Sequence, residues 1–194
     1  MGVKCGDDER FLIKWKGWSA ALPSAAGTDT VEWLRYVSCR VAHMERAVMI
    51  SVEKLTPPDR DAWEALFRAY IDFYQRVEPP EMYERAWREF QADTRMHALG
   101  ARLNARLVGV THFLIHPNTS GPDVCYLQDL FTAPDARGKG VGRALIEAVS
   151  EWAREQGCRR VYWLTHESNA TARRLYDSLA ENRGFIRYQI ELSG

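Results

Sequence analysis

The chain has 194 residues, with 46% hydrophobic residues and a formal net charge of zero from 26 basic and 26 acidic side chains. This length suits one domain with a sizeable core and is short for two. The balanced charge creates no field that would attract nucleic acid or an anionic membrane, so neither is an expected partner. The four cysteines are scattered without a Cys-x-x-Cys pair, and no apolar stretch has the length of a signal peptide or a membrane span. We therefore expect a cytoplasmic protein.

The N-terminal segment, residues 1–46, differs in character from the rest of the chain. It contains three tryptophans and a run of small residues, and neither a strand-like nor a helix-like period runs through it. We expect either a poorly ordered extension or an artefact of start-site choice, with translation beginning at Met44 or Met49. The compact domain is expected over residues 47–194.

One strand and two helices are predicted at the start of this domain. Residues 48–55 alternate between apolar and polar side chains and predict a strand. Thr56 or Asp59 can cap the helix that follows, in which aromatic and aliphatic residues recur at helical spacing. A second amphipathic helix is expected after Pro79 and Pro80.

Three strands follow these helices. Residues 96–103 and 107–116 are strand-like, and Asn104 with Ala105 forms a plausible hairpin turn, so the two strands are expected to pair antiparallel. Residues 124–132 predict another apolar strand.

Helices and strands alternate in the last third of the chain. A helix beginning near residue 141 should end at Gly157, because glycine favours the position just after a helix. The next elements are a short buried strand at residues 161–165, a helix at residues 169–181 and a closing strand at residues 185–192.

A glycine-rich run lies between the strand at residues 124–132 and the next helix, with the sequence Arg137-Gly138-Lys139-Gly140-Val141-Gly142. Glycines let a ligand approach the backbone closely, and the first N–H groups of a helix attract phosphate. A P-loop would need a suitably placed glycine upstream of Gly138-Lys139, which the chain lacks, and a dinucleotide-binding loop would need glycine where Leu145 stands. The run predicts a pyrophosphate site of another kind, with a glycine turn that binds nothing as the alternative.

A second motif, Asn-x-x-Ala-x-x-x-Tyr, extends from Asn169 to Tyr176 on a predicted helix. Together with the pattern Arg137-x-x-Gly140-x-Gly142, it resembles the GCN5-related N-acetyltransferase (GNAT) superfamily, from about Val48 to the C-terminus. The resemblance implies an enzyme that transfers the acetyl group of acetyl-CoA to an amine. It also implies an α/β (α+β) architecture, the GNAT acyl-CoA acyltransferase fold, in which a mixed, mostly antiparallel sheet of about six to seven strands is flanked by about four helices.

The resemblance also assigns residues to the acetyl-CoA site. In the family the asparagine contacts the arm of acetyl-CoA, and a bulge in the strand at residues 124–132 exposes backbone groups toward the pantetheine and the thioester. The implied contact residues are Leu130, Phe131, Thr132, Arg137, Gly138, Lys139, Gly140, Val141, Gly142, Arg143, Asn169, Ala172 and Tyr176.

Tyr176 is the predicted general acid. In the family the tyrosine hydroxyl points at the thioester sulfur, and a phenol with a pKa of about 10 can protonate a thiolate whose conjugate acid has a pKa near 8.5 or above. The amine would attack the thioester directly, in a ternary complex. The alternative for Tyr176 is a purely structural place in an apolar stripe with Ala172 and Leu175.

The general base has three candidates. Residues 126–131 resemble a Tyr-Leu-Glu-Asp segment of small polyamine acetyltransferases, but Gln128 replaces the glutamate and cannot accept a proton. Asp129 would point to the opposite face of the strand unless a bulge re-aims it, and a structural hydrogen-bonding role is its alternative. Glu167, just after a strand, is the second candidate, and a water relay is the third.

The identity of the acceptor is open. The C-terminal motifs resemble a branch of small yeast GNAT enzymes that acetylate histone tails, polyamines or D-amino acids, so a small-molecule or peptide amine is expected. Amino acids, antibiotic-like amines and a non-catalytic acyl-CoA sensor are the alternatives. Family members use their first two helices to wall the acceptor site, and an aromatic and acidic wall suits a cationic amine. The candidate wall residues are Tyr70, Asp72, Tyr74, Glu78, Glu81, Tyr83 and Glu84.

A metal site is not expected, and a homodimer is. His112 and His116 share one face of a predicted strand, but no third ligand stands at a useful spacing, so we interpret them as ordinary histidines. The predicted C-terminal strand and the habits of the family make a homodimer the expected assembly.

Overall fold

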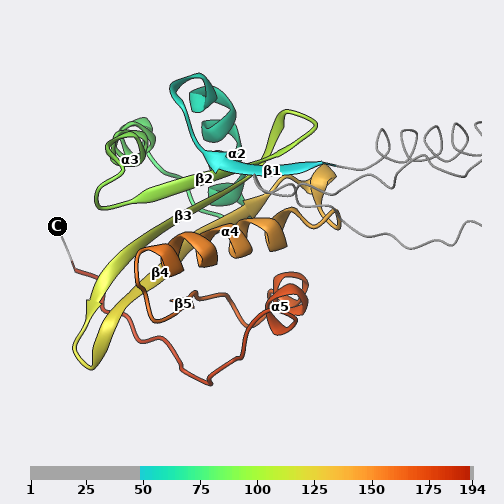
Figure 1. The fold of residues 1–194 in the computed structure, drawn as a ribbon. Coiled ribbons are helices and arrows are strands. Elements are labelled where there is room, and N and C mark those ends of the chain that lie inside the picture. Colours follow the sequence, from blue (N-terminus) through green and yellow to red (C-terminus); the bar gives the residue numbers. More distant parts are fainter. Residues whose placement is uncertain (1–48, 193–194) are drawn as a thin grey trace, which may run out of the picture.

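The computed structural model describes residues 49–192, so the predictions for residues 1–46 lie outside the described residues. Its elements alternate in the manner expected for a mixed α/β protein (Figure 1). In chain order they are β1 (Ile50–Lys54), η1 (Pro57–Asp59), α2 (Arg60–Phe73), α3 (Pro80–Ala92), β2 (His97–Leu103), β3 (Arg106–Asn118), β4 (Gly121–Thr132), η2 (Pro134–Ala136), α4 (Val141–Glu155), β5 (Val161–Tyr162) and α5 (Ala170–Asp177).

The described strands form one sheet in the order β1-β2-β3-β4-β5. The first three pairings are antiparallel, and β4 pairs with β5 in parallel. Asn104 and Ala105, with φ values of 50° and 68°, make the turn between β2 and β3. Two consecutive positive φ values are the signature of a type I′ hairpin turn, so the predicted hairpin is confirmed.

A capping box starts the first helical layer. The Asp59 carboxylate accepts hydrogen bonds of 2.9 Å from both the backbone N–H and the hydroxyl of Thr56. It also accepts one of 2.6 Å from Arg102 on β2, which ties the start of α2 to the sheet. The cap predicted at Thr56 or Asp59 is therefore present, and it uses both residues.

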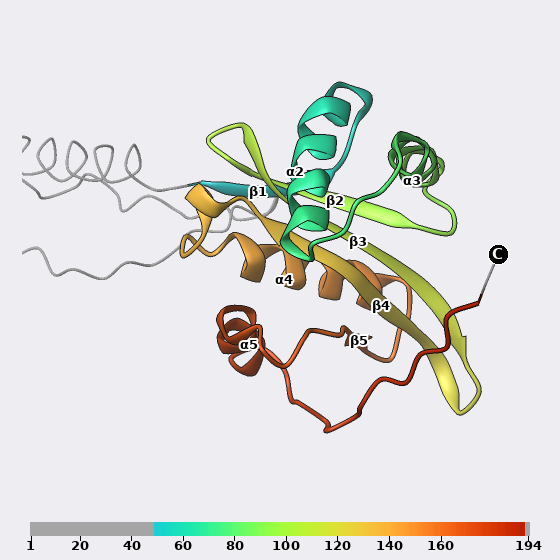
Figure 2. The same cartoon turned by 180° about the vertical axis from the view of Figure 1, so that it is seen from behind.

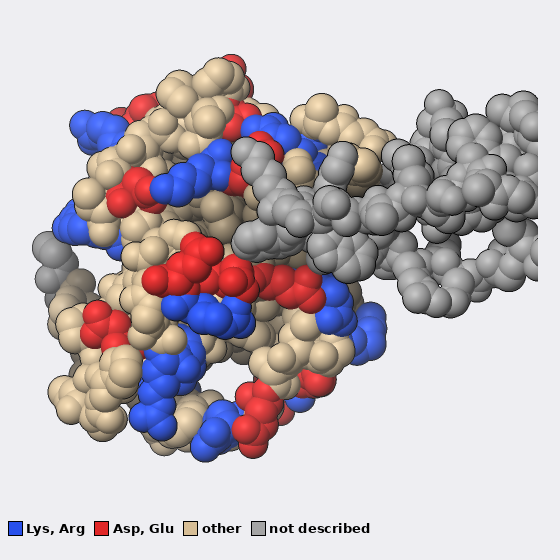
Figure 3. All heavy atoms as spheres, in the orientation of Figure 1, with Lys and Arg blue, Asp and Glu red and all other residues tan. Residues whose placement is uncertain are grey.

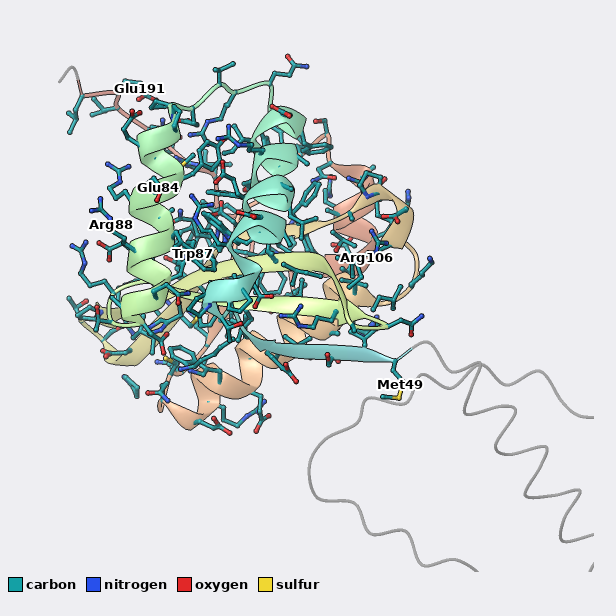
Figure 4. All side chains as sticks on the ribbon, turned by 90° about the horizontal axis from the view of Figure 1, so that it is seen from above. Met49, Glu84, Trp87, Arg88, Arg106 and Glu191 are labelled. Carbon is teal, nitrogen blue, oxygen red and sulfur yellow. The ribbon has the colours of Figure 1, made fainter. Side chains whose placement is uncertain are left out.

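Helices cover both faces of the sheet (Figures 1 and 2). Helices α2 and α3 pack on one face over an aromatic cluster that includes Trp63, Phe67 and Phe90. Figure 4 looks down on this layer, with α2 and α3 side by side and Trp87 labelled on α3. Helix α4 packs on the opposite face, where a Cβ atom at Gly109 would lie only 2.7 Å from Val141. A glycine at this position of β3 therefore allows α4 to approach the sheet closely.

The sheet has five strands in the described residues, so the prediction of six to seven was too high. The strand expected at residues 161–165 is only Val161–Tyr162, and the strand expected at residues 185–192 is absent from the described fold. A strand needs a neighbouring edge to pair with, and only two residues of β5 are paired. The segment at residues 185–192 finds no such edge, and Phe185 and Ile190 are 89% and 85% exposed.

The surface of the domain carries both signs of charge. Figure 3 shows Lys and Arg interspersed with Asp and Glu on the face that it presents. Among residues 49–192, no helix has both the length and the apolar character needed to cross a membrane.

Candidate active site

The glycine run lies at the N-terminus of α4, as its position in the sequence predicts. Gly138 and Gly140 have φ values of 74° and 84°, and Gly140 occupies the N-cap position of the helix without a side chain to cap it. No side chain of the described residues caps this end, so the first backbone N–H groups of a fifteen-residue helix are available to a ligand. The positive end of the helix dipole and these N–H groups fit a pyrophosphate.

Basic side chains connect this loop to its neighbours. Arg137 donates a 3.3 Å hydrogen bond to the Thr132 carbonyl at the end of β4, and Arg143 donates one of 2.9 Å to the Ser178 hydroxyl after α5. A Cβ atom at Gly142 would lie 3.1 Å from Leu175 of α5. The loop, the end of β4 and α5 therefore form one continuous site.

Strand β4 has an open edge beside this loop. It pairs with β5 only through Cys125 and Tyr126, and β5 ends at Tyr162. Leu130, Phe131 and Thr132 keep their partners on β3, but no described strand pairs with their other edge. The backbone groups predicted to meet acetyl-CoA therefore lie on an edge that a ligand can reach.

Tyr176 lies on α5 and packs against Trp163, with 5.3 Å between the ring centroids. Burial, with a smaller contribution from Tyr74, raises its pKa to about 12. Asn169 caps the same helix, because its side-chain oxygen accepts a 3.3 Å hydrogen bond from the N–H of Ala172. In this structure, therefore, Asn169 orients the helix that carries Tyr176.

A β-bulge changes the direction of the β4 side chains. His112 pairs with Asp129 and Phe113 pairs with Leu127, which leaves Gln128 without a partner on β3. Gln128 and Asp129 consequently both line a cavity of about 280 Å³ between the sheet and the α2–α3 layer. Simple alternation would separate these two side chains, so the bulge re-aims Asp129.

Polar side chains of β3 and α2 hold Asp129 at this bulge. His112 Nδ1 donates a 2.9 Å hydrogen bond to Asp129 Oδ2, and the Thr111 hydroxyl donates one of 2.9 Å to the Asp129 carbonyl. On the far side of the imidazole, Trp63 Nε1 donates a 2.9 Å hydrogen bond to His112 Nε2. The Tyr70 hydroxyl also interacts with the carboxylate.

Two tyrosines of the α2 region link Asp129 to Tyr176. The rings of Tyr70 and Tyr74 meet at a centroid distance of 5.2 Å. Burial and the Asp129 charge raise the pKa of both phenols, so both are protonated at neutral pH. Tyr74 also raises the pKa of Tyr176. The pair Tyr70 and Tyr74 therefore extends from the Asp129 carboxylate to the predicted general acid.

Comparison with known proteins places the chain in a family. The family model described as the acetyltransferase (GNAT) family matches residues 63–180. The chain belongs to the acetyltransferase (GNAT) family. The D-amino-acid N-acetyltransferase HPA3 of Saccharomyces cerevisiae is 34% identical over 145 residues, which cover 72% of this chain and 89% of that protein. The uncharacterized N-acetyltransferase YhfO of Bacillus subtilis is 27% identical over 144 residues, which cover 72% of this chain and 95% of that one.

Solved structures share the GNAT fold. AAC(6')-Iy, in complex with the bisubstrate analogue CoA-S-monomethyl-acetylneamine, superposes with a TM-score of 0.65 at 19% identity. The match covers 74% of this chain and 99% of that chain. The predicted family, fold class and enzyme class, an N-acetyltransferase, are thus confirmed, and the family implies acetyl-CoA as the acetyl donor.

The prediction that acidic side chains of the first two helices wall the acceptor site was wrong in part. Glu78 forms an ion pair with Arg76, Glu84 forms one with Arg60, and Tyr83 is buried against the core. The cavity instead has a mixed polar lining, which consists of Arg76, Arg85, Glu89, Gln128 and Asp129. Arg60 on α2 and Arg76 in the segment between the two helices therefore neutralise two of the carboxylates that the sequence pattern presented as free.

Glu167 does not line the cavity between the sheet and the α2–α3 layer. It is exposed in the turn between β5 and α5, and its carbonyl accepts a hydrogen bond of 3.1 Å from Arg173. Its carboxylate makes no hydrogen bond or ion pair within residues 49–192. The structure therefore brings Asp129, but not Glu167, next to the tyrosines.

The two histidines of β3 have different surroundings. His116 Nε2 lies 3.0 Å from the Tyr162 hydroxyl, whereas His112 is fully buried beside Asp129. No group of three His, Cys, Asp or Glu side chains in the described part of the chain could hold a metal ion. The sequence interpretation of His112 as ordinary missed its contact with Asp129. A polar residue in the middle of the apolar β3 sequence was the one available signal.

Proposed function

We propose that this chain transfers the acetyl group of acetyl-CoA to the primary amine of a small molecule, by direct attack in a ternary complex with Tyr176 as general acid. The observation that carries the proposal is the continuity of the site. The uncapped N-terminus of α4 lies beside the open edge of β4, and α5 carries Tyr176 over the same region. This arrangement suits a ligand with a pyrophosphate at one end and a reactive thioester at the other.

Each part of the site has a role in this proposal. Acetyl-CoA supplies an acetyl group activated as a thioester. The backbone N–H groups of residues 138–142, with Lys139 and Arg143, would hold the pyrophosphate, and the free edge of Leu130 would bind the pantetheine amides. The new C–N bond forms as the C–S bond breaks, a base takes the proton of the amine, and Tyr176 gives its proton to the departing thiolate.

Direct attack is supported by the state of the cysteines. Cys125 is buried and burial raises the pKa of its thiol to about 12. Burial also raises the pKa of Cys158. A thiol must ionise to act as a nucleophile, so neither cysteine of the described residues is suited to carry an acetyl group.

A second proposal concerns the acceptor, which we infer to be an amine that also carries a carboxylate, as an amino acid does. Asp129 lies in the cavity together with Arg76 and Arg85. Arg76 already pairs with Glu78, but Arg85 makes no ion pair within the described residues. A zwitterion would place its ammonium at Asp129 and its carboxylate at Arg85, and it would attack as the neutral amine after the ammonium has lost one proton to solvent. One relative is a D-amino-acid N-acetyltransferase by name, which supports amino acids as the class of acceptor.

Initial-rate kinetics on the full chain tests both proposals. Thiol release from acetyl-CoA would be followed with D- and L-amino acids, polyamines and lysine peptides as acceptors. Intersecting double-reciprocal lines are expected for a ternary complex, and Tyr176→Phe should lower kcat by about tenfold or more with little change in acetyl-CoA affinity. Tight acetyl-CoA binding without thiol release for any acceptor would instead favour an acyl-CoA sensor.

We also propose that the protein acts in the cytoplasm as a homodimer. The support for the dimer is the run of exposed apolar side chains after α5, which a second copy could cover.

A further inference from the structure

We propose that His112, locked in one tautomer by Trp63, is a positioning residue that holds the Asp129 carboxylate at the bulge to receive the proton of the acceptor amine. The inference rests on the proposed acetyl transfer, and it names the general base of that reaction and the residue that positions this base. It concerns a chain of three side chains that starts in the core at Trp63 and ends at the cavity.

The hydrogen bonds define the tautomer of His112. An indole N–H only donates, so the 2.9 Å contact with Trp63 Nε1 requires a lone pair on His112 Nε2. A neutral imidazole with a lone pair on Nε2 carries its proton on Nδ1. That proton points at Asp129 Oδ2, 2.9 Å away, which is an acceptor. Both ring nitrogens therefore have the partner that this one tautomer needs.

The surroundings oppose any other state of the ring. His112 has no solvent exposure, and Phe90 stacks on it at a centroid distance of 4.3 Å while Phe67 meets its edge at 4.7 Å. Trp63 is also fully buried and is covered by the Arg60 guanidinium, 5.1 Å from its ring centroid. Forming an imidazolium would break the Trp63 bond and place a second donor against an indole N–H in a dry site.

This lock leaves Asp129 as the group that can change its protonation. The contacts with His112 and Gln128 both fall on Oδ2, so the carboxylate keeps lone pairs for the Tyr70 hydroxyl and for a ligand in the cavity that it lines. When the amine nitrogen bonds to the acetyl carbon, its proton passes to the Asp129 carboxylate. His112 keeps its own Nδ1 proton throughout, and the carboxylate returns to its charged form when the proton leaves to solvent. The imidazole therefore aims the carboxylate and does not exchange protons with it.

Other titratable and charged groups face this pair and must be considered in any pH study. Helix α2 contributes Tyr70, and the turn and loop after it contribute Tyr74 and Arg76. Helix α3 contributes Arg85 and Glu89, and β4 itself contributes Tyr126. The three tyrosines are protonated and the two arginines are charged at neutral pH, so none of these five changes state between about pH 5 and 8.

Two isosteric variants isolate the hydrogen bond to Asp129. The amide nitrogen of His112→Asn can replace Nδ1 as a donor, whereas His112→Leu has nearly the same size and no donor. We expect His112→Leu to lower kcat by about tenfold or more with an unchanged acetyl-CoA dissociation constant, and His112→Asn to recover most of that loss. A purely structural role would give both variants the same kcat once thermal unfolding shows that they fold.

Trp63→Phe tests the lock itself. We expect the 15N spectrum of the native protein to show His112 with a protonated Nδ1 and an unprotonated Nε2, with the resonance identified from its loss in His112→Asn. In Trp63→Phe the Nε2 lone pair is freed, so a second tautomer or a new ionisation between about pH 5 and 8 should appear in the spectrum and in the kcat profile.

Specific outcomes would overturn the inference. A protonated Nε2 in the native protein would overturn it, as would equal kcat values for the native protein, His112→Asn and His112→Leu. If Trp63→Phe does not fold, the native spectrum and the isosteric pair still decide. Absence of turnover by the native protein with every acceptor would instead reject the proposed function, and the inference with it.

Discussion

The side chain of Tyr176 has surroundings that keep its phenol protonated. Trp163 lies beside its ring, Tyr74 lies near its hydroxyl, and burial raises its pKa to about 12. A phenol with this pKa stays protonated at every pH at which the enzyme is expected to work. It can still protonate a departing thiolate, because the same buried surroundings would also raise the pKa of the thiol and so keep the two pKa values close.

The raised pKa of Tyr176 predicts a specific alkaline titration. Below about pH 9 the phenol is protonated in both the folded and the unfolded chain and adds no pH dependence to stability. Between about pH 10 and 12 the unfolded chain loses this proton while the folded chain keeps it, so the free energy of unfolding falls as pH rises. Tyr176→Phe should make this fall shallower in urea unfolding at pH 9 and 11, and it should remove a step near pH 12 from the tyrosine absorbance titration. If Tyr176→Phe instead removed a step near pH 10, the prediction of a raised pKa would be contradicted.

Arg85 provides a second test at the scale of one residue. If it binds the carboxylate of the acceptor, Arg85→Gln should raise KM for amino acids by about tenfold or more, because a charge-assisted hydrogen bond contributes about 1.5–3 kcal/mol. KM for a simple amine without a carboxylate should change little. The matched control is Arg88→Gln, since Arg88 lies on the same helix (Figure 4) but not in the cavity lining. Equal effects of the two variants would contradict the assignment.

At the scale of elements, two glycines flank helix α4. Their backbone strain is similar, but they lie at opposite ends of the helix. Gly138 precedes the helix with a φ of 74°, and Gly157 follows it with a φ of 76°. A Cβ atom at either position would meet no described atom within 4 Å. The two sites therefore differ in their distance from the ligand, while the backbone cost of a side chain is the same.

This pair predicts a separation of stability from binding. Gly138→Ala and Gly157→Ala should each lower the free energy of unfolding by about 1 kcal/mol, because a positive φ is unfavourable for alanine. Only Gly138→Ala should weaken acetyl-CoA binding, since its backbone belongs to the pyrophosphate loop. Urea unfolding and calorimetric titration with acetyl-CoA measure the two effects. Equal affinity losses in both variants would exclude a special role for the loop.

The elements also show what the sequence could and could not predict. Helices α2, α3 and α4, the β2–β3 hairpin and the glycine loop follow from local periodicity and turn chemistry, and each is present. The extent of β5 depends on how far β4 offers it an edge, which is a long-range property. The contact between Trp63 and His112 joins residues 49 positions apart. The bulge that re-aims Asp129 was anticipated from the family resemblance, and periodicity alone would have placed this side chain on the wrong face.

At the scale of the whole molecule, the segment after α5 is the feature that a single copy leaves uncovered. Ile186, Tyr188, Ile190 and Leu192 occupy alternate positions and are 73%, 85%, 85% and 88% exposed. In an extended chain, alternate residues share one face. Four large apolar side chains on one face are typical of a strand that packs against another surface, and the proposed homodimer would provide that surface on a second copy.

Sedimentation analysis of the full chain can test this dimer. We expect the native protein to sediment as a dimer at micromolar concentrations and the double variant Ile186→Lys, Ile190→Lys to sediment as a monomer, because two buried charges on one face would oppose association. The control is Val77→Lys in the loop between α2 and α3, where an apolar side chain is 96% exposed but stands outside this segment. It should remain a dimer. A native chain that stays monomeric, or a double variant that still dimerises, would show that the segment does not join two copies.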